Sequence, residues 1–292
     1  MAFRPEWYKN DSPGQRRGRS LPDWSAIRWI ATVTFSVFLI QILAAGNGGG
    51  DPLSRVLGLR AWWPVVTELP GGEAGIERSF NLMFPLQLFT YMAVHQLGGL
   101  SHVLFNMFVL WVLGRDLEPS MGKASFLRLY LTAGAVGGLA QWGGYLLSGD
   151  IGSVIGASGA VYGVMMLAVL RDPQKSMIIL PFPFPIPLWL LVGLRVLGDV
   201  NGLLFGGGPI AYLVHLTGAA VGYLWFKRGD VVGRAHVQYK RAKTTQKREA
   251  QAGGRREMDR ILGKIQSEGL SSLTKSERSF LNERSRELRE KG

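Results

Sequence analysis

The chain of 292 residues contains no cysteine, which excludes disulfide bonds, cysteine proteases and thiolate metal sites. Its formal net charge is +12, and most of the excess lies in residues 227–292, where 18 Lys and Arg outnumber 9 Asp and Glu. Because basic residues beside a membrane segment orient it in the bilayer, and no nucleic-acid-binding motif accompanies the charge, we expect no nucleic-acid partner.

Apolar runs follow one another between residues 26 and 226, and each is close to the length that crosses a bilayer as a helix. The first run follows a polar, basic segment and precedes further runs, so we interpret it as an anchor rather than a signal peptide. The sequence therefore predicts an all-α, polytopic membrane bundle of six transmembrane helices. The predicted spans lie near 26–45, 101–115, 124–147, 157–170, 177–198 and 209–226.

Helix-ending residues set the limits of several spans. Gly114 and Arg115 predict the end of the second span, and Pro173 predicts the end of the fourth. The fifth span has four prolines between residues 181 and 187. Neighbouring helices must shield such an interrupted span, or its helix begins only after Pro187.

The distribution of Lys and Arg predicts the orientation. They are frequent in the segment 1–25, after the second and fourth spans and after residue 226, and absent after the third and fifth spans. Both termini are therefore expected in the cytoplasm. The connection 46–100 contains three arginines, but a long loop crosses the membrane largely regardless of charge. Its stretch 80–94 is apolar enough to lie in the membrane interface.

The polar tail predicts a small cytoplasmic helical hairpin. Residues 258–267 place apolar side chains on one helical face, Gly269 ends that helix, and Thr274 and Glu277 form the capping-box pattern of a second helix. Such a hairpin is too small for a substantial core, so we expect partner binding or self-association through 258–289. The expected divisions are a basic N-terminal segment 1–25, a membrane domain 26–226, a basic linker 227–257 and the tail 258–292.

Three groups of polar residues fall within the predicted spans, where polar groups are costly and suggest function. The second span opens with His102 and Asn106, which are four apart and share a helix face. The fourth opens with Gly156-Ala157-Ser158-Gly159, and the sixth contains His215. Each group alone has a structural explanation, since small residues favour helix packing and Asn can bond between helices. The predicted topology places all three in the outer half of the membrane.

Together these residues have the parts that peptide hydrolysis requires: a nucleophile, a base and donors for the oxyanion. Ser158 can be the nucleophile and His215 the base, while His102, Asn106 and the Ser158 backbone N–H can be the donors. The spans contain no obvious carboxylate that would orient His215, so we expect a Ser–His dyad. Tyr162, one turn after Ser158, can hold the imidazole.

Small residues predict close contact between the helices that carry the dyad. Gly218 and Gly222 follow His215 by three and seven residues and allow the sixth span to approach the fourth. Gly159 allows the same approach from the fourth span. No metal or cofactor is expected.

These motifs resemble the rhomboid intramembrane proteases over about residues 80–226. The motifs are His102-x-x-x-Asn106, Gly156-Ala157-Ser158-Gly159 with Tyr162, and His215-x-x-Gly218-x-x-x-Gly222. The resemblance implies a six-helix core with Ser158 as nucleophile, His215 as base, and His102 and Asn106 in the oxyanion hole. It also implies cleavage of transmembrane protein substrates near small, helix-weakening residues.

The resemblance has one departure and one addition. Leu86-Gln87 stands where rhomboids often carry Trp-Arg, a difference that affects the first loop rather than the chemistry. The segment 258–289 looks like a tail found on some bacterial rhomboids, and we expect a multi-pass protein of the bacterial inner membrane.

Two other functions compete with a protease. The first is a catalytically inactive rhomboid-like scaffold, but such relatives typically lose the Ser or the His, and this chain keeps both. The second is a small transporter, for which Arg195 and Asp199, four apart in the fifth span, would form an ion pair. Ala160 and the missing strand before it exclude the G-x-S-x-G elbow of soluble hydrolases.

Overall fold

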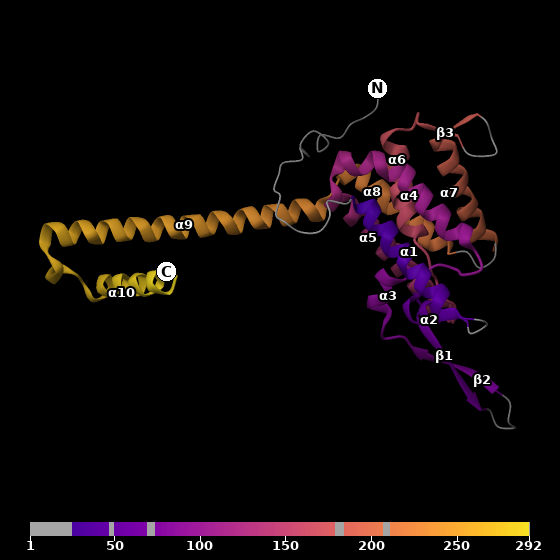
Figure 1. The fold of residues 1–292 in the computed structure, drawn as a ribbon, viewed down its shortest axis with the longest axis horizontal. Helices are drawn as coiled ribbons and strands as arrows, with labels where there is room; N and C mark the ends of the chain where they lie inside the picture. Colours follow the sequence, from indigo (N-terminus) through magenta and orange to yellow (C-terminus); the bar gives the residue numbers. More distant parts are fainter. Residues whose placement is uncertain (1–24, 47–49, 69–73, 179–183, 207–210, 292) are drawn as a thin grey trace. The chain divides into compact units, whose positions relative to one another are not determined.

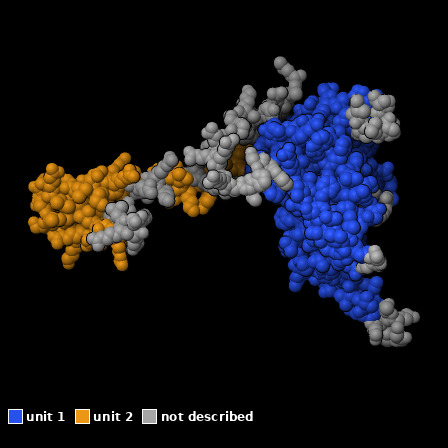
Figure 2. All heavy atoms as spheres, in the orientation of Figure 1, with its two compact units in different colours: residues 1–230 blue, residues 231–292 orange. Residues whose placement is uncertain are grey.

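The structure is a computed structural model that describes residues 25–46, 50–68, 74–178, 184–206 and 211–291. The predicted basic segment therefore lies almost wholly outside the described residues, as do Pro181 and Pro183. The chain divides into two compact units, residues 1–230 and residues 231–292 (Figure 2).

The first unit is mostly helical, with two short two-stranded sheets among the described residues (Figure 1). Its elements are α1 (Ala26–Ala45), α2 (Pro52–Leu57), β1 (Trp62–Glu68), β2 (Ala74–Phe80), α3 (Phe84–Thr90), α4 (Leu100–Met121), α5 (Lys123–Ser148), α6 (Ser158–Arg171), β3 (Ser176–Ile178), β4 (Pro185–Pro187), α7 (Leu188–Phe205) and α8 (Tyr212–Arg228). In the described part of the chain, α1, α4 and α7 are long and apolar enough to cross a membrane, and α6 is a shorter apolar helix.

The predicted helix ends agree with the structure at some positions and not at others. Helix α6 ends at Arg171, before Pro173 as predicted, and α7 begins after Pro187, which is the second of the two alternatives. The predicted end at Gly114 and Arg115 is wrong, because α4 continues to Met121.

Packing explains the glycine inside α4. A Cβ atom on Gly114 would lie 2.9 Å from side-chain atoms of both Ile27 and Phe126. The missing side chain thus lets α4 pack closely and does not end the helix. Glu118, further along α4, is buried and accepts from the backbone N–H of Ala26 at 2.7 Å, which caps the start of α1.

The long connection before α4 contains structure that the sequence did not predict. Strands β1 and β2 form an antiparallel pair, and the short helix α3 lies in the stretch expected at the membrane interface. The Leu86-Gln87 pair has a clear role here. Leu86 is exposed, whereas Gln87 is buried, donates to the Val56 carbonyl at 2.7 Å and accepts from Asn81 Nδ2 at 2.6 Å.

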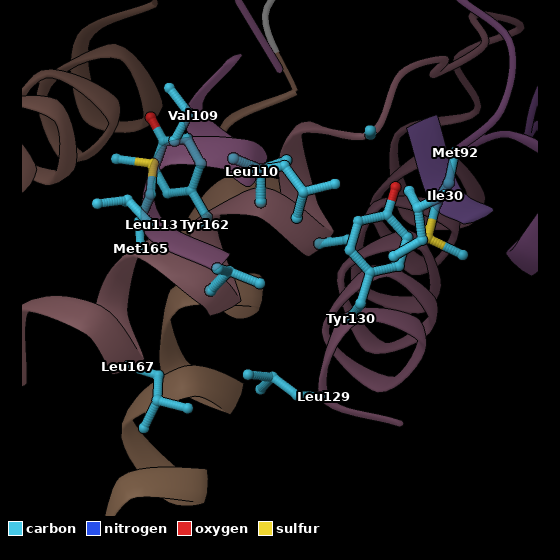
Figure 3. Packing of buried hydrophobic residues seen from close by; sticks show 14 of the residues in the cluster. Ile30, Met92, Val109, Leu110, Leu113, Leu129, Tyr130, Tyr162, Met165 and Leu167 are labelled. Atoms are coloured by element: carbon cyan, nitrogen blue, oxygen red, sulfur yellow. The ribbon is translucent and has the colours of Figure 1, made fainter. Parts of the chain in front are cut away.

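Helix α6 lies at the centre of the unit, with ten of its 14 residues buried. It packs against α4, α5, α7 and α8. Figure 3 shows Tyr162 and Met165 of α6 gathered with Val109 and Leu113 of α4. The residue that begins α6 is Ser158, so the most enclosed helix also carries the predicted nucleophile.

The second unit consists of α9 (Val231–Glu268), η2 (Leu270–Ser272) and α10 (Lys275–Lys291). Helix α9 begins far before the predicted helix, so the expected linker 227–257 is largely helical. This segment lacks proline and is rich in Lys, Arg, Gln and Ala, which favour a helix. As predicted, helix α9 ends before Gly269. The φ of this glycine is +80°.

The capping box at the start of α10 is confirmed. The Thr274 N–H donates to Glu277 Oε2 at 2.8 Å, and the Glu277 N–H donates to Thr274 Oγ1 at 3.3 Å. Glu277 also accepts from Arg260 at 2.7 Å and from Lys264 at 3.2 Å. These bonds join the last turns of α9 to the first turn of α10.

Candidate active site

The segment before Ser158 is shaped by a glycine that no other residue can replace easily. Gly156 has a φ of +112°, and its N–H donates to the Tyr91 carbonyl at 2.9 Å. A Cβ atom at this position would lie 2.9 Å from His102 Cε1. The chain therefore passes directly beside His102 immediately before it enters α6.

His215 of α8 and Ser158 of α6 are in direct contact. His215 Nε2 lies 2.8 Å from Ser158 Oγ, although 57 residues separate the two in sequence. His215 is buried, and Ser158 is partly buried.

Glycine contacts bring α6 and α8 this close. A Cβ atom on Gly218 would lie 2.1 Å from the Gly159 carbonyl oxygen, and one on Gly222 would lie 2.3 Å from the Gly163 carbonyl oxygen. Only hydrogen fits at Gly218 and Gly222 without a backbone shift. This is the close approach that the glycine spacing predicts.

Tyr162 lies one turn into α6 and stacks on the imidazole of His215. The ring centroids are 4.4 Å apart and the planes differ by 8°. The Tyr162 hydroxyl donates to Asp199 Oδ2 and accepts from Arg195 Nε at 3.0 Å. The side chain is therefore held at both its ring and its hydroxyl.

Asp199 of α7 is buried, and its Oδ1 lies 3.2 Å from His215 Nδ1. The expectation that no carboxylate orients His215 is thus wrong. Asp199 and His215 are 16 residues apart and belong to different helices, so spacing alone does not bring them together. The available signal was an ionisable residue within an apolar segment, which the sequence interpretation used only for a transporter pair with Arg195. That pair is loose, with Arg195 Nη2 4.0 Å from Asp199 Oδ1.

The bond to Asp199 selects the tautomer of His215. A carboxylate can only accept hydrogen bonds, so Nδ1 must carry the imidazole hydrogen and donate it to Asp199. Nε2 is then unprotonated and accepts the Ser158 hydroxyl hydrogen. Ser158 is thereby paired with a nitrogen that can take its proton.

His102 and Asn106 lie on α4, beside the start of α6. The Asn106 side chain is buried, and its Nδ2 donates to the His102 carbonyl at 3.0 Å. The same Nδ2 lies 3.5 Å from His95 Nε2. The rings of His95 and His102 meet edge to face with centroids 5.2 Å apart.

His95 is a site residue that the sequence interpretation missed. It is fully buried, and its Nε2 accepts from the Ala157 backbone N–H at 3.3 Å. Gln41 of α1 holds the His95 backbone, accepting from its N–H at 3.0 Å and donating to its carbonyl at 2.9 Å. The signal was a histidine at the end of an apolar stretch, seven residues before His102.

The N-terminus of α6 has no side-chain cap, and Ala157 is its N-cap residue. The first backbone N–H groups of a helix lack intrahelical partners and carry partial positive charge. The arrangement thus joins a hydroxyl, an imidazole that can accept its proton, and a helix end that attracts negative charge.

Comparisons with known proteins match two parts of the chain, one in each compact unit. The family model of the Rhomboid domain matches residues 85–227, and a family of unknown function, DUF6576, matches residues 242–287. The human presenilin-associated rhomboid-like protein, mitochondrial, is 27% identical over 129 residues, which are 44% of this chain and 34% of that protein. Rhomboid protein 1, mitochondrial, of Saccharomyces cerevisiae is 29% identical over 126 residues, which are 42% of this chain and 36% of that protein.

A plant protein gives a similar match. RHOMBOID-like protein 12, mitochondrial, of Arabidopsis thaliana is 30% identical over 145 residues, which are 44% of this chain and 42% of that protein. The chain therefore spans less than half the length of each of these relatives. All three carry mitochondrial names, which gives no support to the expected bacterial inner membrane.

Proposed function

Because the chain belongs to the rhomboid family of integral membrane proteins, we propose that it is an intramembrane serine endopeptidase. Members of this family are generally intramembrane serine proteases. The observation that carries the proposal is the 2.8 Å contact between Ser158 Oγ and Nε2 of His215. Its substrates are transmembrane proteins, cleaved in or near their membrane-spanning segments.

In the proposed reaction, Ser158 Oγ forms a bond to the carbonyl carbon of the substrate while its proton passes to His215 Nε2. The carbonyl oxygen then carries the negative charge of a tetrahedral intermediate. The peptide C–N bond breaks as Nε2–H gives its proton to the leaving nitrogen. Water next attacks the acyl carbon on Ser158 while one of its protons passes to His215 Nε2. The ester bond to Ser158 Oγ then breaks as that proton returns to Oγ, and the carboxyl product leaves.

The oxyanion is stabilised by donors at the start of α6. The Ser158 backbone N–H is the first donor, since the N-terminus of α6 has no side-chain cap. His102 and Asn106 supply side-chain donors. One Asn106 N–H is bound to the His102 carbonyl, but the other is engaged only by the long 3.5 Å contact with His95 Nε2, which an oxyanion can replace.

The other predicted residues support this geometry. Tyr162 holds the imidazole by stacking, and Gly156 makes room for His102. Gly159, Gly218 and Gly222 set the separation of α6 and α8.

We also propose that six helices cross the membrane, namely α1, α4, α5, α6, α7 and α8, with both termini on one side. Three of them, α1, α4 and α7, are long and apolar enough by themselves. The others have shorter apolar stretches or many small residues, which suit helices enclosed by protein rather than lipid. The segment 258–289 remains the proposed site of partner binding or self-association.

A probe that labels nucleophilic serines tests the central proposal. The full chain in proteoliposomes is treated with a fluorophosphonate and, separately, with a transmembrane model substrate. We expect labelling and cleavage by the wild type and by Ser153→Ala, an exposed serine in the preceding loop, and neither by Ser158→Ala. Equal labelling of Ser158→Ala, or a folded wild type that is neither labelled nor active, would favour an inactive scaffold.

A further inference from the structure

Asp199 occupies an unusual position on α7. Of the 18 residues of this helix, Leu188, Val192 and Asp199 are buried, and large apolar side chains such as Leu197 and Leu204 are exposed. A buried carboxyl group in an apolar helix costs free energy unless it is paired and hydrogen-bonded. The burial of Asp199 therefore needs partners, and each of them belongs to or adjoins the active site.

The two oxygens of Asp199 act on the same imidazole ring, one directly and one through Tyr162. Oδ1 faces His215 Nδ1 at 3.2 Å, and Oδ2 accepts from the hydroxyl of Tyr162, the residue that stacks on His215. Arg195 donates its Nε–H to the Tyr162 hydroxyl at 3.0 Å, which leaves the hydroxyl hydrogen for Asp199. One carboxyl group thus fixes both the edge of the imidazole and the ring that covers its face.

We propose that Asp199 is a positioning residue that completes a Ser158–His215–Asp199 arrangement, so that the site works as a triad rather than a dyad. This inference rests on the proposed protease function. Asp199 keeps the hydrogen of the imidazole on Nδ1 and turns Nε2 toward Ser158. It takes no proton itself.

The negative charge of Asp199 acts on His215 in addition to orienting its ring. When the Ser158 proton reaches Nε2, His215 becomes an imidazolium with its Nδ1–H directed at the Asp199 carboxylate. Attraction between the two is strong in a region that excludes water. Among the described residues, the other ionisable groups around His215 are Tyr162 on α6, Arg195 on α7 and His102 on α4. Arg195 also faces the carboxylate, with its Nη2 4.0 Å from Asp199 Oδ1.

The test uses the full chain in proteoliposomes and the variants Asp199→Asn, Asp199→Glu and Asp172→Asn. Asparagine can donate to Nδ1 and so favours the tautomer with hydrogen on Nε2, which cannot take the Ser158 proton. We expect Asp199→Asn to lower kcat by about two to four powers of ten with KM within about threefold. Asp199→Glu should recover part of this loss. Asp172 is exposed at the end of α6, so Asp172→Asn should leave kcat unchanged.

A readout independent of activity separates this inference from the proposed function. In Ser158→Ala, ¹⁵N NMR of the His215 imidazole should show hydrogen on Nδ1, and adding Asp199→Asn should move it to Nε2. A wild type without protease activity would refute the proposed function but leave this tautomer measurement valid. The positioning role is overturned if hydrogen lies on Nε2 while Asp199 is present. It is also overturned if Asp199→Asn lowers only the unfolding midpoint and keeps the kcat of the folded protein.

Discussion

Gly218 of α8 lies so close to Gly159 of α6 that a Cβ atom on Gly218 would stand 2.1 Å from the Gly159 carbonyl oxygen. The obstacle is backbone, which cannot move aside as the end of a flexible side chain can. This contact therefore sets the separation of the two helices that carry Ser158 and His215.

Gly218→Ala should push α8 away from α6, which lowers both stability and cleavage. Overpacking of this kind costs about 1–3 kcal/mol. We expect a lower unfolding midpoint in detergent and at least about a tenfold loss of kcat, since one ångström of misplacement can cost a hundredfold. Gly193→Ala on α7 is the matched control, because a Cβ atom there meets nothing within 4 Å. Equal behaviour of the two variants would contradict the packing argument.

Ser158→Ala, His215→Ala and the double variant should lose activity to a similar extent. Residues that act as one catalytic unit are strongly non-additive, so the double variant should fall within about threefold of the worse single variant. Cleavage rates of purified proteins, corrected for the folded fraction, provide the comparison. If the two losses multiply, Ser158 and His215 do not act in one step.

Asn106→Ala should reduce kcat by about one to three powers of ten while KM changes little, because loss of one oxyanion donor costs roughly 2.7–4 kcal/mol in a serine protease. The loss is expected to be at the low end because His102 and the Ser158 N–H share the charge. The side chain also bonds to the His102 carbonyl, so stability must be measured in parallel. Unchanged kcat with a lowered unfolding midpoint would make Asn106 a structural residue.

Both termini should lie on the same side of the membrane. Reporters fused after residue 20 and after residue 250 test this, since six spans place both reporters together and an odd number separates them. We expect both reporters in the cytoplasm, because the terminal segments and the loops on their side of the membrane carry most of the Lys and Arg. Reporters on opposite sides would refute the six-span topology.

The contact between α9 and α10 should weaken in acid. Bonds from the Thr274 N–H, Arg260 and Lys264 lower the pKa of Glu277 from 4.5 to about 2. Because folding lowers this pKa, the Glu277 carboxylate stabilises the contact between α9 and α10 fully above pH 4.5. This stabilisation is lost as the pH falls from 4.5 towards 2. Hydrogen-exchange protection of α10, corrected for the intrinsic rate at each pH, should fall over this range. Glu277→Gln should abolish the pH dependence of this protection. If the variant keeps the same dependence, other groups cause it.

The features that the sequence determined by itself are those in which the interacting residues are close along the chain. The capping box joins Thr274 to Glu277 three residues later, and His102 and Asn106 share a face because a helix repeats every 3.6 residues. The spacing of His215, Gly218 and Gly222 likewise places all three on one helix face, and the two glycines on that face predict close packing.

Tertiary structure decided the contacts that join distant segments. His95 reaches the Ala157 N–H across 62 residues, and Gln41 reaches His95 across 54. Asp199 meets His215 only because α7 packs beside α8 with that face inward. Nothing in the spacing of an aspartate on one helix and a histidine on the next specifies how the helices rotate against each other. Packing over their whole length sets that rotation, and it turned a predicted dyad into a site with a carboxylate behind its histidine.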